Sequence, residues 1–274
     1  MVEGDLVLIH GFWSSPRTWD RLVRVARADD EFGGVAIDAF GYESPIGRMP
    51  FSPARIPDYD DVAHSLASHL ALRDPGRPLV IATHSQGGLI LQRYLAWMAH
   101  EGRARELAII RAVVLLACPN EGSEYLGTIR RALGFGRHPQ AGQLETLVVD
   151  ATDARRTFLQ AIVNATSLTD HTCPIPAYVY AGRTDNVVTR ASAQSVFPRV
   201  GTLPGDHFSI LDPDLPGSLT YPTLKSIVGK AFTEEPAAAS RPEPSPPQFD
   251  LRNSRGVQIG DGGVQNNLFL DDDT

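Results

Sequence analysis

Hydrophobic positions in the first 233 residues alternate between two spacings. Short apolar runs recur at 6–9, 35–37, 79–82, 113–117, 177–181 and 200–203, and all but the last are apolar at every position. Segments between them repeat apolar residues every three or four positions. This spacing predicts amphipathic helices at 16–28, 59–72 and 222–232, with a further one after residue 87. Continuous apolar strands separated by amphipathic helices predict an α/β fold, in which a parallel sheet is covered by helices on both faces.

The same pattern divides the chain into three parts. Residues 1–233 form the expected folded domain, interrupted at 119–176 by a segment too long for an ordinary loop. That segment has helical spacing at 154–165 and is expected to form a lid. Residues 234–249 are rich in proline, alanine and serine, and they predict an extended linker because they cannot bury enough apolar surface to order themselves. Residues 250–274 have a different character.

Composition and charge exclude several classes of function. The net charge is −7 and no basic patch stands out, which argues against a nucleic-acid partner. No stretch approaches the roughly 18 apolar residues of a transmembrane helix. Cys118 and Cys173 match no metal or disulfide spacing, so no metal is expected. The amino-terminal stretch shows no signal peptide, and a cytoplasmic location is the expectation.

The motif with the strongest chemical implication surrounds Ser85. Thr83-His84-Ser85-Gln86-Gly87 follows the apolar run 79–82 and precedes a helix with an apolar face. A serine between a strand and a helix forces a sharp turn that raises its hydroxyl above the sheet. The helix N-terminus adds positive potential for an oxyanion. The plainer alternative is a serine that caps the helix, but the complete strand–turn–helix context favours a nucleophile.

Two further residues follow later strands in positions that suit a serine nucleophile. Asp185 comes just after the run 177–181, and His207 just after 200–203. Loops at the carboxyl edge of a parallel sheet can bring such residues together. A serine hydroxyl needs a base to take its proton, and the base needs an acid to fix its tautomer. The sequence therefore predicts Ser85, Asp185 and His207 as catalytic residues.

The residues alone leave alternatives open for two of these roles. Glu121, after the strand at 113–117, could serve as the acid. His84 or His171 could serve as the base, although His84 adjoins the serine and His171 lies in the inserted segment. His10 is expected to have a structural role, tying down the loop that follows the first strand.

An oxyanion hole requires a second backbone donor from a neighbouring loop. Gly11 permits a tight backbone after the strand at 6–9. The backbone amides of Phe12 and Gln86 are therefore the predicted oxyanion donors.

Taken together, these motifs resemble the α/β-hydrolase family over residues 1 to about 233. The matching stretches occur in the family's order and are HGFW at 10–13, THSQGG at 83–88, GRTDNVV at 182–188 and GDHFSIL at 205–211. The resemblance implies an α/β-hydrolase fold with a mostly parallel sheet of about six strands and a helical lid. It implies the same catalytic and oxyanion residues and no cofactor. Thr83 stands where the family usually has glycine.

The substrate class is suggested by weaker features. CPNEGS at 118–123 looks like a turn found in lipase-like members, and Trp13 with the lid would line an apolar pocket. Hydrolysis of a small-molecule or lipid carboxylic ester is the leading interpretation. A cofactor-free haloperoxidase-like activity, an ordinary metabolic esterase with an irrelevant tail, and a non-catalytic signalling or scaffold protein remain alternatives.

The carboxyl-terminal segment has a pattern of its own. Val257, Gln258, Ile259 and Gly260 lie among further glycines and amide residues, an alternation that suits stacked strands with amide ladders. The segment resembles prokaryotic amyloid signalling motifs related to the RIP homotypic interaction motif. This resemblance implies self-assembly, a receptor with a matching motif as partner, and a hydrolase effector in a cell-death or defence pathway. A disordered tail is the plainer alternative.

Overall fold

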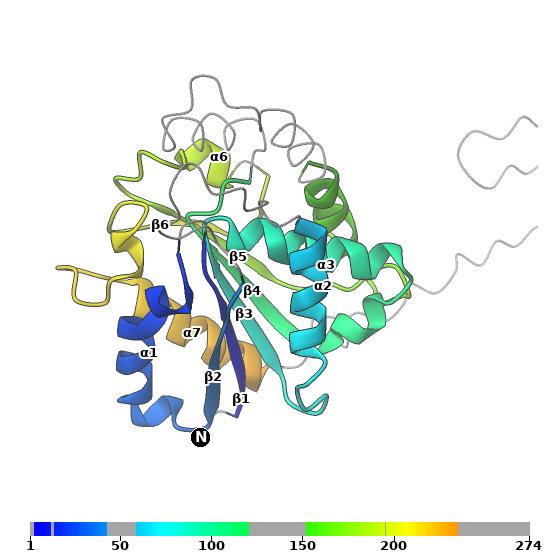
Figure 1. The fold of residues 1–274 in the computed structure, drawn as a ribbon, viewed down its shortest axis with the longest axis horizontal. Coiled ribbons are helices and arrows are strands. Elements are labelled where there is room, and N and C mark those ends of the chain that lie inside the picture. The colour runs from blue at the N-terminus through cyan, green and yellow to red at the C-terminus, as the bar shows by residue number, and fades with distance from the viewer. Residues whose placement is uncertain (1–2, 12–13, 43–58, 121–151, 195, 235–274) are drawn as a thin grey trace, which may run out of the picture. The chain divides into compact units, whose positions relative to one another are not determined.

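The described part of the chain forms one six-stranded sheet in which every neighbouring pair of strands is parallel. The computed structural model describes residues 3–11, 14–42, 59–120, 152–194 and 196–234 (Figure 1). The strand order is β2-β1-β3-β4-β5-β6. The strands are β1 (Gly4–Ile9), β2 (Val35–Phe40), β3 (Leu79–His84), β4 (Ile110–Leu116), β5 (Ala177–Gly182) and β6 (Val200–Leu203). The six strands predicted from apolar runs are confirmed.

Helices lie between consecutive strands and after β6, and they include those that the spacing predicted. They are α1 (Asp20–Arg27), α2 (Tyr59–Leu70), α3 (Gly87–His100), α6 (Arg190–Gln194) and α7 (Thr220–Thr233). A short 3₁₀ turn, Pro16–Trp19, precedes α1, so the predicted helix at 16–28 begins as a tighter turn. The prediction was wrong at one end of α2. Its helix stops at Leu70 and Leu72 is 87% exposed, because the chain turns there to carry Arg73 back to the sheet.

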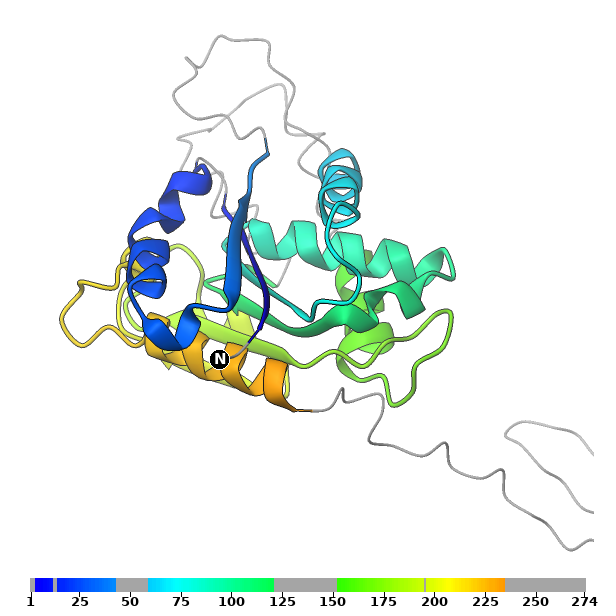
Figure 2. The same cartoon turned by 90° about the horizontal axis from the view of Figure 1, so that it is seen from below.

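Alternating strand residues feed two cores, one on each face of the sheet. In β1, Val7 and Ile9 join the core beneath α2 and α3, whereas Leu6 and Leu8 join the core beneath α1 and α7. Figure 2 shows these two helix pairs on opposite faces. Burial on both faces explains why the strands are mostly apolar and do not alternate regularly with polar residues.

The segment expected to form a lid is described in part. Residues 152–176 are described, and a helical stretch at 152–163 ends in a π turn, Leu159–Val163. Phe158 and Ile162 are fully buried in the core beneath α2 and α3. This half therefore covers the sheet as an ordinary part of the domain. Residues 121–151 lie outside the described residues, and the lid predicted for 119–176 stays a prediction.

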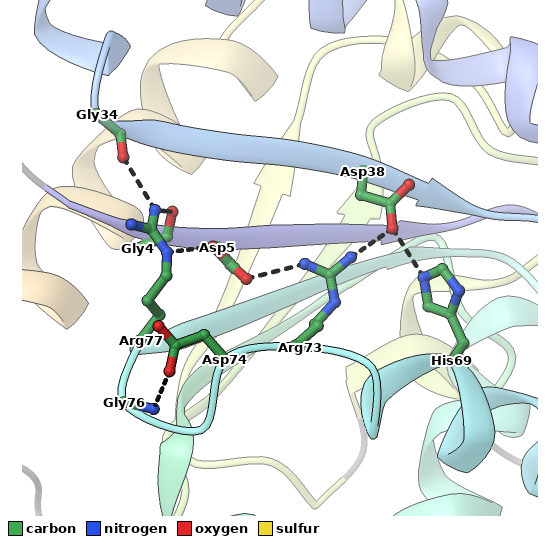
Figure 3. A network of polar contacts seen from close by, with 9 residues as sticks. All are labelled: Gly4, Asp5, Gly34, Asp38, His69, Arg73, Asp74, Gly76 and Arg77. Atoms are coloured by element: carbon green, nitrogen blue, oxygen red, sulfur yellow. Dashed lines mark hydrogen bonds and ion pairs between the residues drawn. The ribbon is translucent and has the colours of Figure 1, made fainter.

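A polar network joins the first two strands at the amino end of the sheet (Figure 3). Asp5 of β1 is 7% exposed and accepts from Arg73 Nη1 at 3.0 Å and from Arg77 Nε at 2.9 Å. Arg73 also binds Asp38 of β2, which accepts from His69 Nε2 at 2.8 Å. The loop after α2 is thereby fastened to β1 and β2, at the edge opposite to Ser85.

Replacing Asp5 with asparagine should lower the free energy of unfolding by about 3 kcal/mol, because it removes one of the two carboxylates that pair with the largely buried Arg73 and also the one that pairs with Arg77. Asp74→Asn is the matched control. Asp74 is exposed and its Oδ1 accepts from Gly76 N, a role that an amide oxygen retains, so its effect should stay within about 0.5 kcal/mol. Urea unfolding measures both. Equal unfolding free energies for the two variants would contradict a stabilising role of the network.

Candidate active site

Ser85 lies in a strained turn between β3 and α3. Its φ is +53°, in the left-handed region that non-glycine residues rarely adopt, and its amide donates to Leu116 O at 3.0 Å. Neighbouring backbone approaches closely. A Cβ on Gly87 would come within 2.6 Å of His10 O, and one on Gly11 within 2.8 Å of the Ser85 Cβ. The two glycines therefore allow α3 and the loop after β1 to pack against the turn. Such strain in a non-glycine residue is typical of functional sites.

The structure accounts for threonine at position 83, where the family usually has glycine. Thr83 is fully buried, and its hydroxyl donates to Val114 O at 3.3 Å and lies 3.4 Å from Cys118 Sγ. Gly88 leaves the room that this side chain needs. A Cβ on Gly88 would be 3.3 Å from Thr83 Oγ1 and 2.4 Å from Cys118 Sγ. Gly88, on the first turn of α3, thus leaves room for the side chains of Cys118 and Thr83 together.

The three residues predicted to act together form one continuous chain of contacts. The imidazole Nε2 of His207 is 2.9 Å from the Ser85 hydroxyl oxygen, and its Nδ1 is 3.0 Å from Asp185 Oδ2. The His207 and Asp185 side chains are 6% and 1% exposed. Asp185 Oδ1 accepts from the amides of Val187 and Val188, both at 2.8 Å. These two amides fix the carboxylate plane, so that its second oxygen faces the imidazole.

The loop that carries His207 is held by bonds of its own. Gly205 has φ +110°, and its carbonyl accepts from Thr184 N at 3.1 Å. Asp206 Oδ1 accepts from the amides of Phe208 and Ser209 at 3.0 and 2.8 Å. Phe208 packs edge-on against the His207 ring at 5.1 Å between centroids, yet it is 71% exposed. A large apolar ring is therefore held in an exposed position beside the imidazole.

The alternatives for the base occupy other positions. His171 Nδ1 donates to the carbonyl of Ala99, at the far end of α3. His84 Nε2 is 2.7 Å from the backbone carbonyl of His207, so its proton is directed away from Ser85. Complete burial lowers the pKa of His84 to about 3. Glu121, the alternative acid, lies outside the described residues.

His10 has the local bonding expected of a structural residue. Its Nδ1 donates to the Gly11 carbonyl at 2.9 Å, its Nε2 accepts from the Tyr42 amide at 3.4 Å, and its ring stacks on Tyr42. Burial lowers its pKa, so the neutral ring is favoured. Of the predicted oxyanion donors, Gln86 stands at the N-terminus of α3, whereas Phe12 lies outside the described residues.

Several features bear on cofactors and membranes. Cys118 and Cys173 are both buried thiols, and burial raises the pKa of Cys118 to about 12 and that of Cys173 to about 11. Neither thiol is therefore an activated nucleophile. Within the described ranges, no group of three or more histidine, cysteine or acidic side chains is placed to hold a metal ion. In the same part of the chain, no helix is long and apolar enough to cross a membrane.

A comparison with protein-family models matches residues 6–246 to the alpha/beta hydrolase family. The chain belongs to this family. Among solved structures, the hydrolase resembles a soluble variant of monoglyceride lipase from Saccharomyces cerevisiae, with 18% identity, a TM-score of 0.54, and coverage of 85% of this chain and 89% of the lipase. It also resembles ClbQ from the colibactin NRPS/PKS pathway, with 14% identity, a TM-score of 0.52, and coverage of 84% and 98%. At these identities the likeness concerns the fold. No curated protein gave a match.

Proposed function

We propose that this alpha/beta hydrolase is a serine hydrolase that cleaves carboxylic esters, with Ser85 as nucleophile, His207 as base and Asp185 as the orienting carboxylate. The observation that carries the proposal is the unbroken path from the Ser85 hydroxyl through both imidazole nitrogens of His207 to Asp185, with contacts of 2.9 and 3.0 Å. Hydrogen-bond distances of this kind are what an activated serine requires.

The bonding of Asp185 supports a definite tautomer of His207. The carboxylate can only accept, so the proton of a neutral ring faces it from Nδ1. Nε2 then directs its lone pair at the Ser85 hydroxyl, where it can take the proton as Oγ attacks the acyl carbon. The protonated Nε2 next gives this proton to the leaving alcohol. Water, deprotonated by the same nitrogen, then attacks the acyl carbon, and Nε2 returns the proton to Ser85 Oγ as the acid is released.

The tetrahedral intermediate carries a negative oxygen that needs donors fixed in advance. We assign this role to the backbone amides of Gln86 and Phe12. Gln86 stands at the start of α3, where amides lack intrahelical partners and the helix contributes positive potential. Lipid esters are included in the proposed substrate range, since exposed Phe208 offers an apolar surface beside His207.

A fluorophosphonate probe tests the assignment of the nucleophile. It should attach to one serine of the native protein, and digestion followed by mass spectrometry should map the adduct to the peptide that contains Ser85. Ser85→Ala should give no adduct, whereas Ser209→Ala, which changes another serine near the site, should label like the wild type. Equal labelling of the wild type and Ser85→Ala would overturn the proposal, as would equal hydrolysis of an ester panel by both.

We further propose that residues 257–260 assemble this hydrolase into stacked strands, so that a receptor with a matching motif could cluster and activate it as an effector. The support lies in the sequence alone. Apolar and amide residues alternate from Val257, glycines follow, and the residues outside the segment are charged. The proline-rich stretch at 234–249 would give the segment freedom to reach other copies.

Assembly is tested on the full chain. Wild-type protein should bind thioflavin after seeding with its own fibrils and should hydrolyse esters faster in the assembled state. Gly260→Asp should do neither, because a charge in the stack is repeated in every copy. Ala237→Asp adds the same charge in the linker and should behave like the wild type. Identical behaviour of wild type and Gly260→Asp would favour an ordinary esterase with an irrelevant tail.

A further inference from the structure

His84 links the turn of the nucleophile to the loop of the base. It is the last residue of β3 and immediately precedes Ser85. Its Nε2 lies 2.7 Å from the backbone carbonyl of His207, 123 positions further along the chain. The two rings stand 5.0 Å apart between centroids. The mechanism proposed above gives the His84 side chain no role, although it is 3% exposed and lies between two of the three catalytic residues.

The direction of this hydrogen bond is fixed by its partners. A carbonyl can only accept, so the proton of His84 must reside on Nε2. Desolvation lowers the pKa of His84 to about 3, which leaves the ring neutral with a single N–H. Among the described residues, none pairs with His84 Nδ1. Moving the proton to Nδ1 would therefore break the hydrogen bond to the His207 carbonyl without forming a new one. The tautomer with its proton on Nε2 is the one that the structure favours.

The hydrogen bond of His84 joins the backbones of the two residues between which the catalytic proton moves, Ser85 and His207. Ser85 is joined covalently to His84, and the imidazole of His207 is joined covalently to the carbonyl that His84 holds. Ser85 and His207 are therefore linked twice, once by the contact between Ser85 Oγ and His207 Nε2 and once through the hydrogen bond of His84. This second link is much shorter than the path between the two residues through the strands of the sheet. Displacement of reacting groups by about 1 Å can cost about 100-fold in rate.

We propose that His84 is a positioning residue, whose Nε2–H fixes the backbone of His207 and so holds the imidazole at transfer distance from Ser85. The inference rests on the proposed function. It assigns to His84 no contact with substrate and no proton transfer of its own. Its effect should consequently fall on kcat, with KM for a small ester left nearly unchanged.

Two amide substitutions separate this role from mere filling of space. Glutamine places an amide nitrogen near the position of Nε2, whereas asparagine is shorter and places it near Nδ1. His84→Gln should keep kcat within about 3-fold of the wild type, and His84→Asn should lower kcat by about 10- to 100-fold with KM changed less than about 2-fold. If His84→Asn does not fold, His84→Met, of similar length and without a donor, replaces it with the same expectation.

A spectroscopic readout accompanies the kinetics. The Nδ1 proton of His207, shared with Asp185, should give a low-field proton resonance that persists in His84→Gln and broadens or shifts in His84→Asn. The positioning role would be overturned if His84→Gln and His84→Asn both kept the wild-type kcat. It would also be overturned if both lost kcat equally and lost thermal stability equally. Failure of the proposed function is distinguishable, because Ser85→Ala would then retain activity. If Ser85→Ala is inactive while His84→Asn keeps wild-type kcat, the inference about His84 alone fails.

Discussion

His207→Ala should reduce kcat for ester hydrolysis by about 10⁶-fold, a loss comparable to removal of the nucleophile itself. The structure places the Nε2 atom of this imidazole 2.9 Å from Ser85 Oγ, within hydrogen-bond distance. Without it, the serine hydroxyl keeps its proton during attack and the leaving alcohol receives none. The residual rate would come from the oxyanion donors and substrate binding. Steady-state kinetics with a chromogenic ester measure the effect.

His171→Ala is the matched control for that substitution. It removes the same side chain from a position where the ring bonds to the Ala99 carbonyl and is exposed. Its kcat should remain within a few-fold of the wild type, with at most a lower melting temperature. A large loss of kcat in His171→Ala together with an active His207→Ala would reverse the assignment of the base.

Asp185→Asn should lower kcat by about 10⁴-fold while leaving the fold intact. The asparagine oxygen can still accept from the amides of Val187 and Val188, so its NH₂ group must face His207. The imidazole then accepts at Nδ1 and carries its proton on Nε2, directed at Ser85. In that tautomer it cannot act as a base, although every atom lies close to its original position.

Asp206→Asn tests whether this loss is specific to the tautomer. Asp206 also lies beside His207, but its Oδ1 serves backbone amides and the Ser209 hydroxyl, which an amide oxygen can replace. Its kcat should change by no more than a few-fold. If Asp185→Asn proved as active as Asp206→Asn, Glu121 would become the preferred acid. Circular dichroism and melting temperatures should be alike for both variants and the wild type.

The three proposed catalytic residues could be picked out from the sequence because each one lies next to a short apolar run that predicts a strand. Ser85 follows an apolar run and precedes an amphipathic helix, and Asp185 and His207 each come soon after a strand-length run. In a parallel sheet, these local positions are enough to place all three at one edge. The exact pairing of Asp185 with the two amides that hold it could not be read from the chain, since it depends on how the turn after β5 closes.

Other contacts had no comparable signal. His84 looked like a competitor for the base, and its bond to the His207 carbonyl joins residues 123 positions apart. Asp5 is a single polar residue in an apolar strand, and its partners Arg73 and Arg77 come from a loop beyond α2. Leu72 fits the helical spacing, but α2 ends at Leu70, and the turn that follows brings Arg73 to Asp5.

The sequence by itself determined the fold class, the six strands and the residues offered for catalysis, because burial on both faces and turn chemistry act over a few neighbouring positions. Only the tertiary structure decided which histidine meets Ser85, what makes room for Thr83 and how Asp185 is oriented. Those outcomes depend on distances between segments far apart in the chain. A histidine can take the proton of Ser85 only at hydrogen-bond distance, and one or two ångströms more would leave it without a role in proton transfer.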